Sequence, residues 1–223
     1  MMYYLLPILA VILGFLFVTI FKPQQKQHMK LLLAFSGAFL LAITIFNLLP
    51  NVFSDYKGRY GIFVMAGILL QVFLEFFSKG AEHGHVHIDK DSQKFPWLLF
   101  VSLSIHAVLE GFPMHQHDHL IYGIVVHKVP IAIILTTFFY KSKMTRTSIL
   151  NFLCLFAVMT PLGSFLSEQL TFLEAYQNEI TALVIGIFLH ISTTILFESS
   201  EGHKFNLTKL LVIISATVLA YFI

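Results

Sequence analysis

The stretch 104–134 reads SIHAVLEGFPMHQHDHLIYGIVVHKVPIAII and decides what this chain can be. Two apolar segments, joined by a short polar turn, contain four ionisable residues: His106, Glu110, His127 and Lys128. His106 and Glu110 are four residues apart, so they share one face of a helix. His106 and His127 lie almost symmetrically about the turn, so two antiparallel helices carry them to similar depth. The pattern predicts a His/Glu/His metal site built from adjacent helices.

Ionisable groups inside apolar segments are costly and usually functional. The rival interpretation is that these are isolated histidines, each satisfied by a hydrogen bond within a helical bundle. For any single histidine that interpretation is the better one. The combination of His106 and Glu110 on one face, with His127 at matching depth, favours the metal site.

The composition places the chain in a membrane. Its 223 residues are 57% hydrophobic and only 12% charged, whereas a soluble domain is roughly a quarter charged. Apolar runs of nearly the length needed to span a bilayer recur throughout, which predicts one all-α polytopic membrane domain over 1–223. The single cysteine, Cys154, excludes an intrachain disulfide and a Cys-based zinc site. Residues 1–22 lack a basic leader and a small-residue cleavage site, so we interpret them as a retained first helix.

Eight transmembrane helices are predicted, joined by short connections and without a second domain. Their approximate bounds are 3–21, 31–49, 60–79, 96–114, 120–140, 147–170, 177–197 and 207–223. An even number of spans places both termini on the same side of the membrane.

The distribution of basic residues predicts which side that is. Most of the 14 Lys and Arg residues fall in the odd-numbered loops and at their edges, namely Lys22, Lys26, Lys30, Lys79, Lys90, Lys94, Lys141, Lys143, Arg146, Lys204 and Lys209. The opposite face carries only Lys57 and Arg59. Because cytoplasmic loops are enriched in Lys and Arg, we expect an integral protein of the cell (inner) membrane with both termini outside.

Prolines interrupt the pattern of three consecutive spans, at Pro113, Pro130 and Pro161. Each removes a backbone hydrogen bond and frees a carbonyl, which is tolerated where the backbone is buried in protein or lines a cavity. We expect three breaks along a transport pathway. Ordinary kinks without a function are the alternative.

Two histidine clusters lie outside the predicted spans. His83, His85 and His87 fall in the loop that we expect in the cytoplasm, and His115, His117 and His119 fall in the outer turn above the predicted site. Alternating histidines on a flexible backbone are typical of weak, exchangeable metal binding. We predict accessory capture of metal by the outer cluster and metal binding by the cytoplasmic loop. Each cluster on its own also fits a solvated polar loop.

The ordered motifs resemble those of the ZIP (Zrt/Irt-like) divalent-metal transporters over essentially the full length. HAVLEG in span four is similar to the family's H-N/S-x-x-E-G motif, and VVHKVP in span five is similar to its H-E/K-x-P motif. SGAFLLAITIFNLLP in span two, Glu75 followed by a histidine-bearing loop, AVMTPLGS in span six and GIFLHISTTILFE in span seven follow the family order. The resemblance implies a ZIP-type helix bundle.

The departures from the family pattern remove ligands, mainly of a second metal. Ala107, Lys128, Ile131 and Thr160 stand where the family carries an Asn or carboxylates. The resemblance implies a one-metal subfamily with H-S-x-x-E-G and H-K motifs, in which Lys128 replaces the charge of the second metal. The loss of the glutamate at Ile131 leaves the primary site one ligand poorer, so a member that binds metal without moving it stays an alternative.

The resemblance implies carrier-mediated movement of zinc, or of iron or another divalent ion, into the cytoplasm rather than an enzyme. In that family spans one, four, five and six move against spans two, three, seven and eight. The expected partners are the divalent metal ion and the lipid bilayer, with no nucleic acid, and a homodimer is left open. The alternative function is an intramembrane zinc metallohydrolase that uses His106, Glu110, His127 and also His190.

Overall fold

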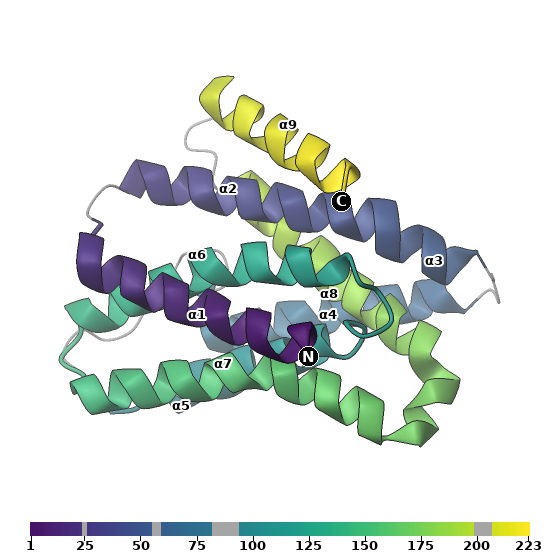
Figure 1. The fold of residues 1–223 in the computed structure, drawn as a ribbon, viewed down its shortest axis with the longest axis horizontal. Coiled ribbons are helices and arrows are strands. Elements are labelled where there is room, and N and C mark those ends of the chain that lie inside the picture. The colour runs from purple at the N-terminus through teal and green to yellow at the C-terminus, as the bar shows by residue number, and fades with distance from the viewer. Residues whose placement is uncertain (24–25, 55–58, 82–93, 199–206) are drawn as a thin grey trace.

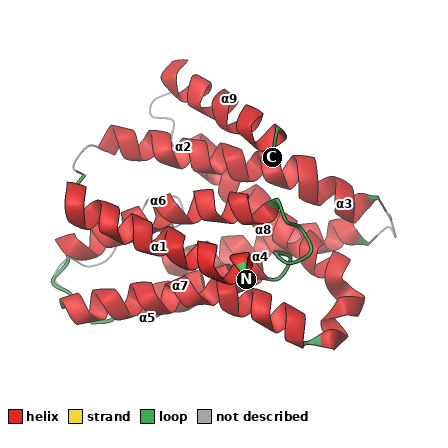
Figure 2. Cartoon of the chain, viewed as in Figure 1, coloured by secondary structure: helices red, strands yellow, loops and turns green. Residues whose placement is uncertain are grey.

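Helices are the only regular secondary structure in the described chain. The structure, a computed structural model, describes residues 1–23, 26–54, 59–81, 94–198 and 207–223. These residues form helices joined by turns and loops, and none of them lies in a strand (Figure 1, Figure 2). The predicted all-α fold class is therefore confirmed for this part of the chain.

Each predicted span coincides with a helix. The helices are α1 (Met2–Phe21), α2 (Lys26–Ile43), η1 (Thr44–Leu48), α3 (Leu49–Phe53), α4 (Tyr60–Ser78), α5 (Trp97–Gly111), α6 (Leu120–Lys141), α7 (Arg146–Gln169), η3 (Thr171–Tyr176), α8 (Gln177–Glu198) and α9 (Leu207–Tyr221). The sequence did not predict η1, a single π-helical turn that joins α2 to α3.

Six of the described helical segments are long and apolar enough to cross a membrane. α5 and α9 are apolar but shorter, at 15 residues each. Such a helix is about 22 Å long, whereas the hydrocarbon core of a bilayer is about 30 Å thick. α5 is shorter than predicted because it ends at Gly111, two residues before Pro113. The number of spans and the side of the termini stay predictions.

The eight longest helices of the described residues pack in two groups of four. α1, α5, α6 and α7 form one group, in which α1 packs on α6 and α7, and α5 packs on α7. α2, α4, α8 and α9 form the other, with α8 packed on α4 and α2, and α9 packed on α2. The groups meet where α2 contacts α6 and where α4 contacts α5. Both chain termini lie toward the end of the bundle that holds the 112–119 loop (Figure 1).

Glycines bring helices of the same group into backbone contact. A Cβ on Gly67 of α4 would meet the backbone carbonyl of Leu183 on α8, and a Cβ on Gly163 of α7 would meet that of Val108 on α5. Where α6 meets α2 of the other group, the approach is less close, since a Cβ on Gly123 of α6 would lie 3.3 Å from the Leu40 side chain. Small residues that allow backbones to approach are the usual basis of helix packing in membranes.

The three prolines lie differently relative to the helices. Pro130 lies inside α6 and Pro161 inside α7, and both helices continue through them, so the predicted loss of a backbone hydrogen bond does not end either helix. Each proline removes one hydrogen bond, which frees the carbonyl of Val126 or Ala157, but packing of the long helices on their neighbours holds them together. Pro113 lies in the loop that follows α5, so α5 ends before it.

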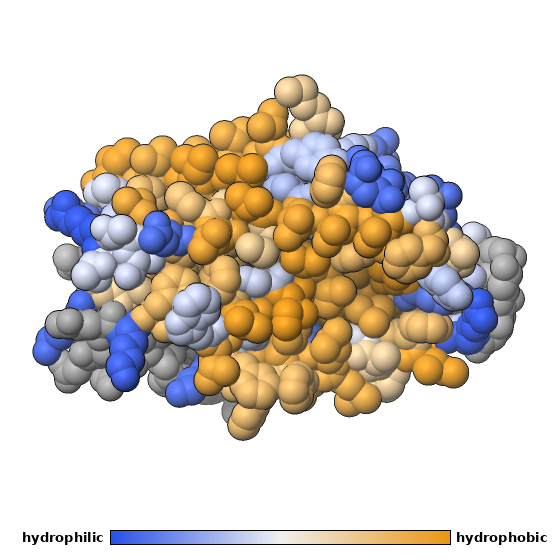
Figure 3. Space-filling view, turned by 90° about the horizontal axis from the view of Figure 1, so that it is seen from below, coloured by the Kyte–Doolittle hydropathy of each residue, from blue (hydrophilic) through white to orange (hydrophobic). Residues whose placement is uncertain are grey.

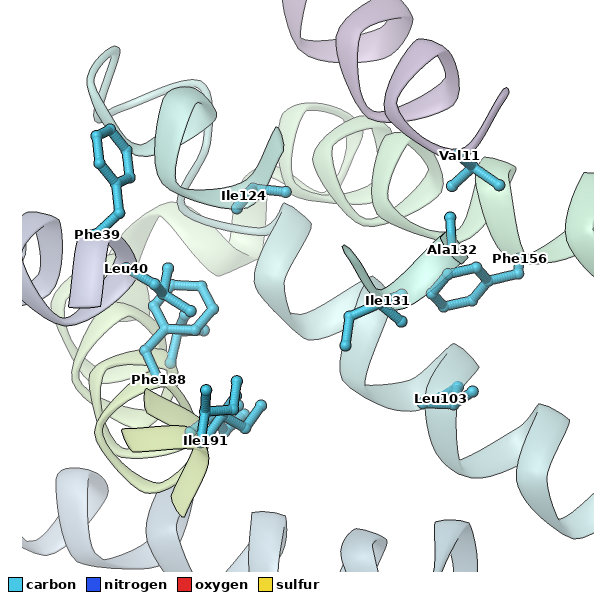
Figure 4. Close-up of a cluster of buried hydrophobic side chains, with 14 of the residues drawn as sticks. Val11, Phe39, Leu40, Leu103, Ile124, Ile131, Ala132, Phe156, Phe188 and Ile191 are labelled. Atoms are coloured by element: carbon cyan, nitrogen blue, oxygen red, sulfur yellow. The ribbon is translucent and has the colours of Figure 1, made fainter. Parts of the chain in front are cut away.

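The apolar residues are divided between a core and the surface. Phe39, Leu40 and Phe188 are fully buried in one part of the core, and Leu103 and Phe156 are buried in another (Figure 4). Large apolar side chains are also exposed along the helices of both groups. Figure 3 shows hydrophobic residues over the middle of one face and hydrophilic residues gathered at the two ends. This is the surface expected of a bundle embedded in lipid.

Candidate functional site

Four ionisable side chains predicted from the sequence meet in the interior. His106 and Glu110 lie one turn apart on α5, and His127 and Lys128 are neighbours on α6. Each is at most 3% exposed. The His106 Nε2 atom lies 3.4 Å from Glu110 Oε2, and the rings of His106 and His127 have centroids 6.3 Å apart with planes at 79°. The predicted shared face and matched depth are thus present in the structure.

The two helices that carry the site do not pack tightly on each other. α5 packs mainly on α7 and α4, and α6 packs mainly on α1 and α2, so their backbones make little direct contact. The polar side chains project into the space between them, and α7 closes that space with Phe156 and Thr160. The site is therefore built from three helices, and not from two adjacent ones as the sequence predicted.

Glu110 is the centre of the hydrogen-bonded network. Lys128 Nζ forms an ion pair with Glu110 Oε1, and the Thr160 hydroxyl donates a 2.6 Å hydrogen bond to the same oxygen. The other carboxylate oxygen faces His106. A buried carboxylate is tolerated only when it is paired and hydrogen-bonded, and these contacts meet both conditions. The ion pair thus joins two of the ionisable residues that the sequence places inside apolar segments.

Lys128 also lies against an aromatic face. Its Nζ atom is 4.9 Å from the centroid of the Phe156 ring, which is a favourable distance for a cation–π interaction. Phe156 and Thr160 lie four residues apart on α7, so they share one face, and that face completes the site. The family pattern identifies Thr160 only as a lost ligand. A polar residue inside an apolar segment, just before a proline, was the signal that could have identified it.

The side chains are neighbours but do not form a closed coordination shell. Among the described residues, no group of three or more His, Cys, Asp or Glu side chains is arranged to hold a metal ion. Glu110 is engaged by Lys128 and Thr160, while His106 Nδ1 is buried with no hydrogen-bond partner in the described part of the chain. A metal site formed by His106, Glu110 and His127 stays a prediction that requires Glu110 to exchange partners.

Two of the positions at which this chain departs from the ZIP pattern carry small or apolar residues, and both are buried in the core. Ala107 is completely buried on α5, and Ile131 is 3% exposed on α6 within the hydrophobic cluster (Figure 4). Neither side chain can bind a metal ion, so any ligands must come from the residues around Glu110.

The outer histidines lie in the loop between α5 and α6. His115 and His117 are partly buried, and His119 is exposed at the start of α6. Burial, and then the charge of neighbouring His115, lower the pKa of His117, which favours the neutral, metal-binding form of its imidazole. The loop is held near α1 because Tyr3 donates a hydrogen bond to Asp118. Accessory metal capture by these residues stays a prediction.

The remaining predicted residues lie elsewhere. His190 on α8 contacts Glu75 on α4, with 2.7 Å between His190 Nε2 and Glu75 Oε2. This partly exposed pair belongs to the other group of helices. This pair was not predicted from the sequence, although both residues are ionisable and lie within apolar segments. His83, His85 and His87 lie outside the described residues.

Comparison with known proteins does not define a family for this chain. No protein-family model matches it, and no curated protein matches it. The resemblance to ZIP transporters therefore depends on the order and spacing of the motifs and is a hypothesis.

Proposed function

We propose that this chain is a ZIP-like transporter that moves a divalent metal ion, zinc or iron, across the membrane into the cytoplasm. The observation that carries the proposal is Glu110, a buried carboxylate shared by His106 on its own helix and by Lys128 on α6. Imidazole and carboxylate together suit zinc and iron. The imidazole rings of His106 and His127 lie close together in the same buried cluster, so the ligand types that a site for these metals uses are present.

The arrangement of the helices supports a carrier. The metal-site residues His106, Glu110 and His127 all belong to the group formed by α1, α5, α6 and α7. Glycine-based contacts hold that group together, and side-chain contacts join it to α2. A movement of this group against the other would carry the site with it and change the side of the membrane to which the site opens, which is what alternating access requires.

Lys128 has a defined role in this mechanism. In the empty state it neutralises Glu110, so the carrier can return without exposing an unpaired carboxylate to the low-dielectric interior. When a metal ion arrives, Glu110 turns from Lys128 to the metal, and the ammonium supplies the positive charge that a second metal would otherwise supply. Thr160 holds the shared oxygen in place during the exchange.

The test is metal uptake into sealed proteoliposomes that contain the purified protein. Radiolabelled Zn²⁺ and Fe²⁺ are supplied outside, and the parent is compared with His106→Ala, Glu110→Ala and His127→Ala. We expect saturable uptake by the parent and its loss in each variant. His28→Ala is the matched control, because His28 is exposed at the start of α2 and far along the chain from the site.

Two outcomes would contradict the proposal at different levels. Full uptake by all three variants would show that the site is wrongly assigned, whereas no uptake of any divalent ion by the folded parent would show that the function is wrong. A change in half-saturation without a change in maximal rate, when His115, His117 and His119 are replaced together by Ser, would support their accessory role.

A further inference from the structure

A second site lies at the opposite end of the bundle from the 112–119 loop. A cavity of about 730 Å³ opens where the end of α1, the end of α6 and the start of α7 come together. The ends of these three helices lie side by side at one end of the molecule (Figure 1). This size falls within the range of ligand sites in proteins.

The cavity has an apolar floor. Phe139 is fully buried, Ile149 is 2% exposed and Met144 is 7% exposed, and all three line it. Two further lining residues, Phe15 and Leu150, lie toward the outside of the bundle, where Leu150 is 45% exposed. The apolar lining is thus continuous with the lipid-facing surface of α1 and α7.

Two exposed cations form the charged part of the lining. Lys22 follows the last turn of α1, and Arg146 is the first residue of α7. No acidic residue lines the cavity, and within the described residues neither cation has an ion-pair partner. A lysine near a helix C-terminus interacts favourably with the helix dipole, so the position of Lys22 has an ordinary explanation.

The helix dipole does not explain the position of Arg146. A cation at the N-terminus of a helix is unfavourable, and α7 has no acidic residue in its first turn to compensate. A bound anion would be attracted both by the guanidinium and by the helix N-terminus. A guanidinium can also bind a phosphate through two parallel hydrogen bonds.

The hydroxyl groups around the cavity are already engaged as donors. Thr19 donates to the Phe15 carbonyl at 2.9 Å, and Ser142 donates to the Phe139 carbonyl at 2.8 Å. The Tyr140 hydroxyl lies 3.1 Å from the Thr19 hydroxyl, and because the Thr19 proton points to Phe15, Tyr140 is the donor there. Recognition of an anion therefore falls to Lys22 and Arg146. The free lone pairs of Tyr140 can accept from a hydroxyl of the ligand.

We propose that this cavity binds one anionic phospholipid, with its phosphate between Lys22 and Arg146 and one acyl chain along Phe15 and Leu150. A free phosphate would leave the apolar floor unfilled, whereas a lipid matches both the charges and the apolar lining. Basic pockets between transmembrane helices are known to bind anionic headgroups. The lining residues lie on α1, α6 and α7, just after α1 and in the loop between α6 and α7, so the lipid would join α1 to α6 and α7. This inference does not depend on the proposed transport.

The test is native mass spectrometry of the full chain, purified in detergent and titrated with phosphatidylglycerol or phosphatidylcholine. The parent should retain one phosphatidylglycerol and bind phosphatidylcholine much more weakly. Lys22→Gln with Arg146→Gln should weaken retention of phosphatidylglycerol by about tenfold or more, since each basic residue contributes appreciably to anionic lipid binding. The exchanged pair Lys22→Arg with Arg146→Lys keeps both charges and should retain most of the binding, which separates loss of binding from loss of folding.

The matched control is Lys79→Gln with Lys141→Gln. It removes the same charge from exposed residues that do not line the cavity, and it should leave retention unchanged. Equal weakening in this control would show attraction by general charge, and equal binding of phosphatidylcholine would show a purely apolar groove. Displacement of the lipid by inorganic phosphate at equal concentration would indicate a phosphate site. Each of these three results would overturn the proposal.

Discussion

At the scale of single residues, Glu110 is the centre of the buried site. It is 1% exposed and takes hydrogen bonds from two side chains on two other helices. Removing one member of a buried ion pair costs about 3–5 kcal/mol, because the other charge is left uncompensated. The pair therefore links the stability of the protein to the proposed function of this site.

We expect Lys128→Met to lower the stability of the purified protein by about 3 kcal/mol or more. The double variant Lys128→Met with Glu110→Gln should lose much less than the sum of the two single changes, because neither charge is then left alone. Thermal unfolding in detergent measures all three variants. Additive losses would show that the two side chains do not interact in solution.

Thr160 allows a second test, with a control of the same residue type. Thr160→Val keeps the volume but removes the donor to Glu110, so we expect a loss of about 1–3 kcal/mol. Thr136 is equally buried, on α6, and its hydroxyl has no hydrogen-bond partner in the part of the chain that the structure describes. Thr136→Val should therefore be neutral or stabilising when the same unfolding measurement is made. If both variants behaved alike, Thr160 would have no specific role at Glu110.

At the scale of the helices, packing within each group depends on glycine. Gly67 and Gly186 lie where α4 crosses α8, and at each of them a Cβ would meet the backbone of the other helix. A backbone carbonyl cannot rotate away as a side chain can, so the helices would have to separate. The same argument applies to Gly111 and Gly163, where α5 crosses α7.

We expect Gly67→Ala to destabilise the protein by about 1–3 kcal/mol, the cost of forcing packed helices apart. Gly61 lies on the same helix and has nothing within 4 Å of its Cβ position. Gly61→Ala should therefore be neutral or slightly stabilising, because alanine favours a helix. The yield and unfolding temperature of the two variants decide the point, and equal effects would contradict the close crossing.

At the scale of the whole molecule, the alternating direction of the helices gives the bundle two ends. Lys141 lies at the end of α6 with the connection to α7, and Glu174 lies in η3 at the other end of α7. α7 has 24 residues, so it is about 36 Å long, enough to place these residues on opposite sides of a bilayer.

An impermeant maleimide can test this arrangement in sealed vesicles. In a Cys154→Ser background, Lys141→Cys and Glu174→Cys should differ, with only one labelled before the vesicles are permeabilised and both labelled afterwards. The positive-inside rule predicts that Glu174→Cys is the one labelled from outside. Labelling of both from the same side would contradict a membrane-spanning α7, and the reverse pattern would contradict the predicted orientation.

Periodicity and composition were sufficient to predict the helices. The long apolar runs required the backbone to satisfy its own hydrogen bonds, so the helix positions followed from local sequence. The spacing of His106 and Glu110 likewise required a shared face, and the symmetric position of His127 required a similar depth. These predictions depend on the geometry of one helix or one hairpin, which the chain carries in its own order.

Only the tertiary structure showed which side chains fill the space between those helices. Thr160 and Phe156 reach Glu110 and Lys128 from a helix distant in sequence, and His190 meets Glu75 across two helices of the other group. The continuity of α6 and α7 through their prolines also depends on neighbouring helices. The cavity with Lys22 and Arg146 arises where three helix ends meet. Contacts of this kind are set by how helices pack, and packing depends on residues that are far apart in the chain, so no local pattern predicts them.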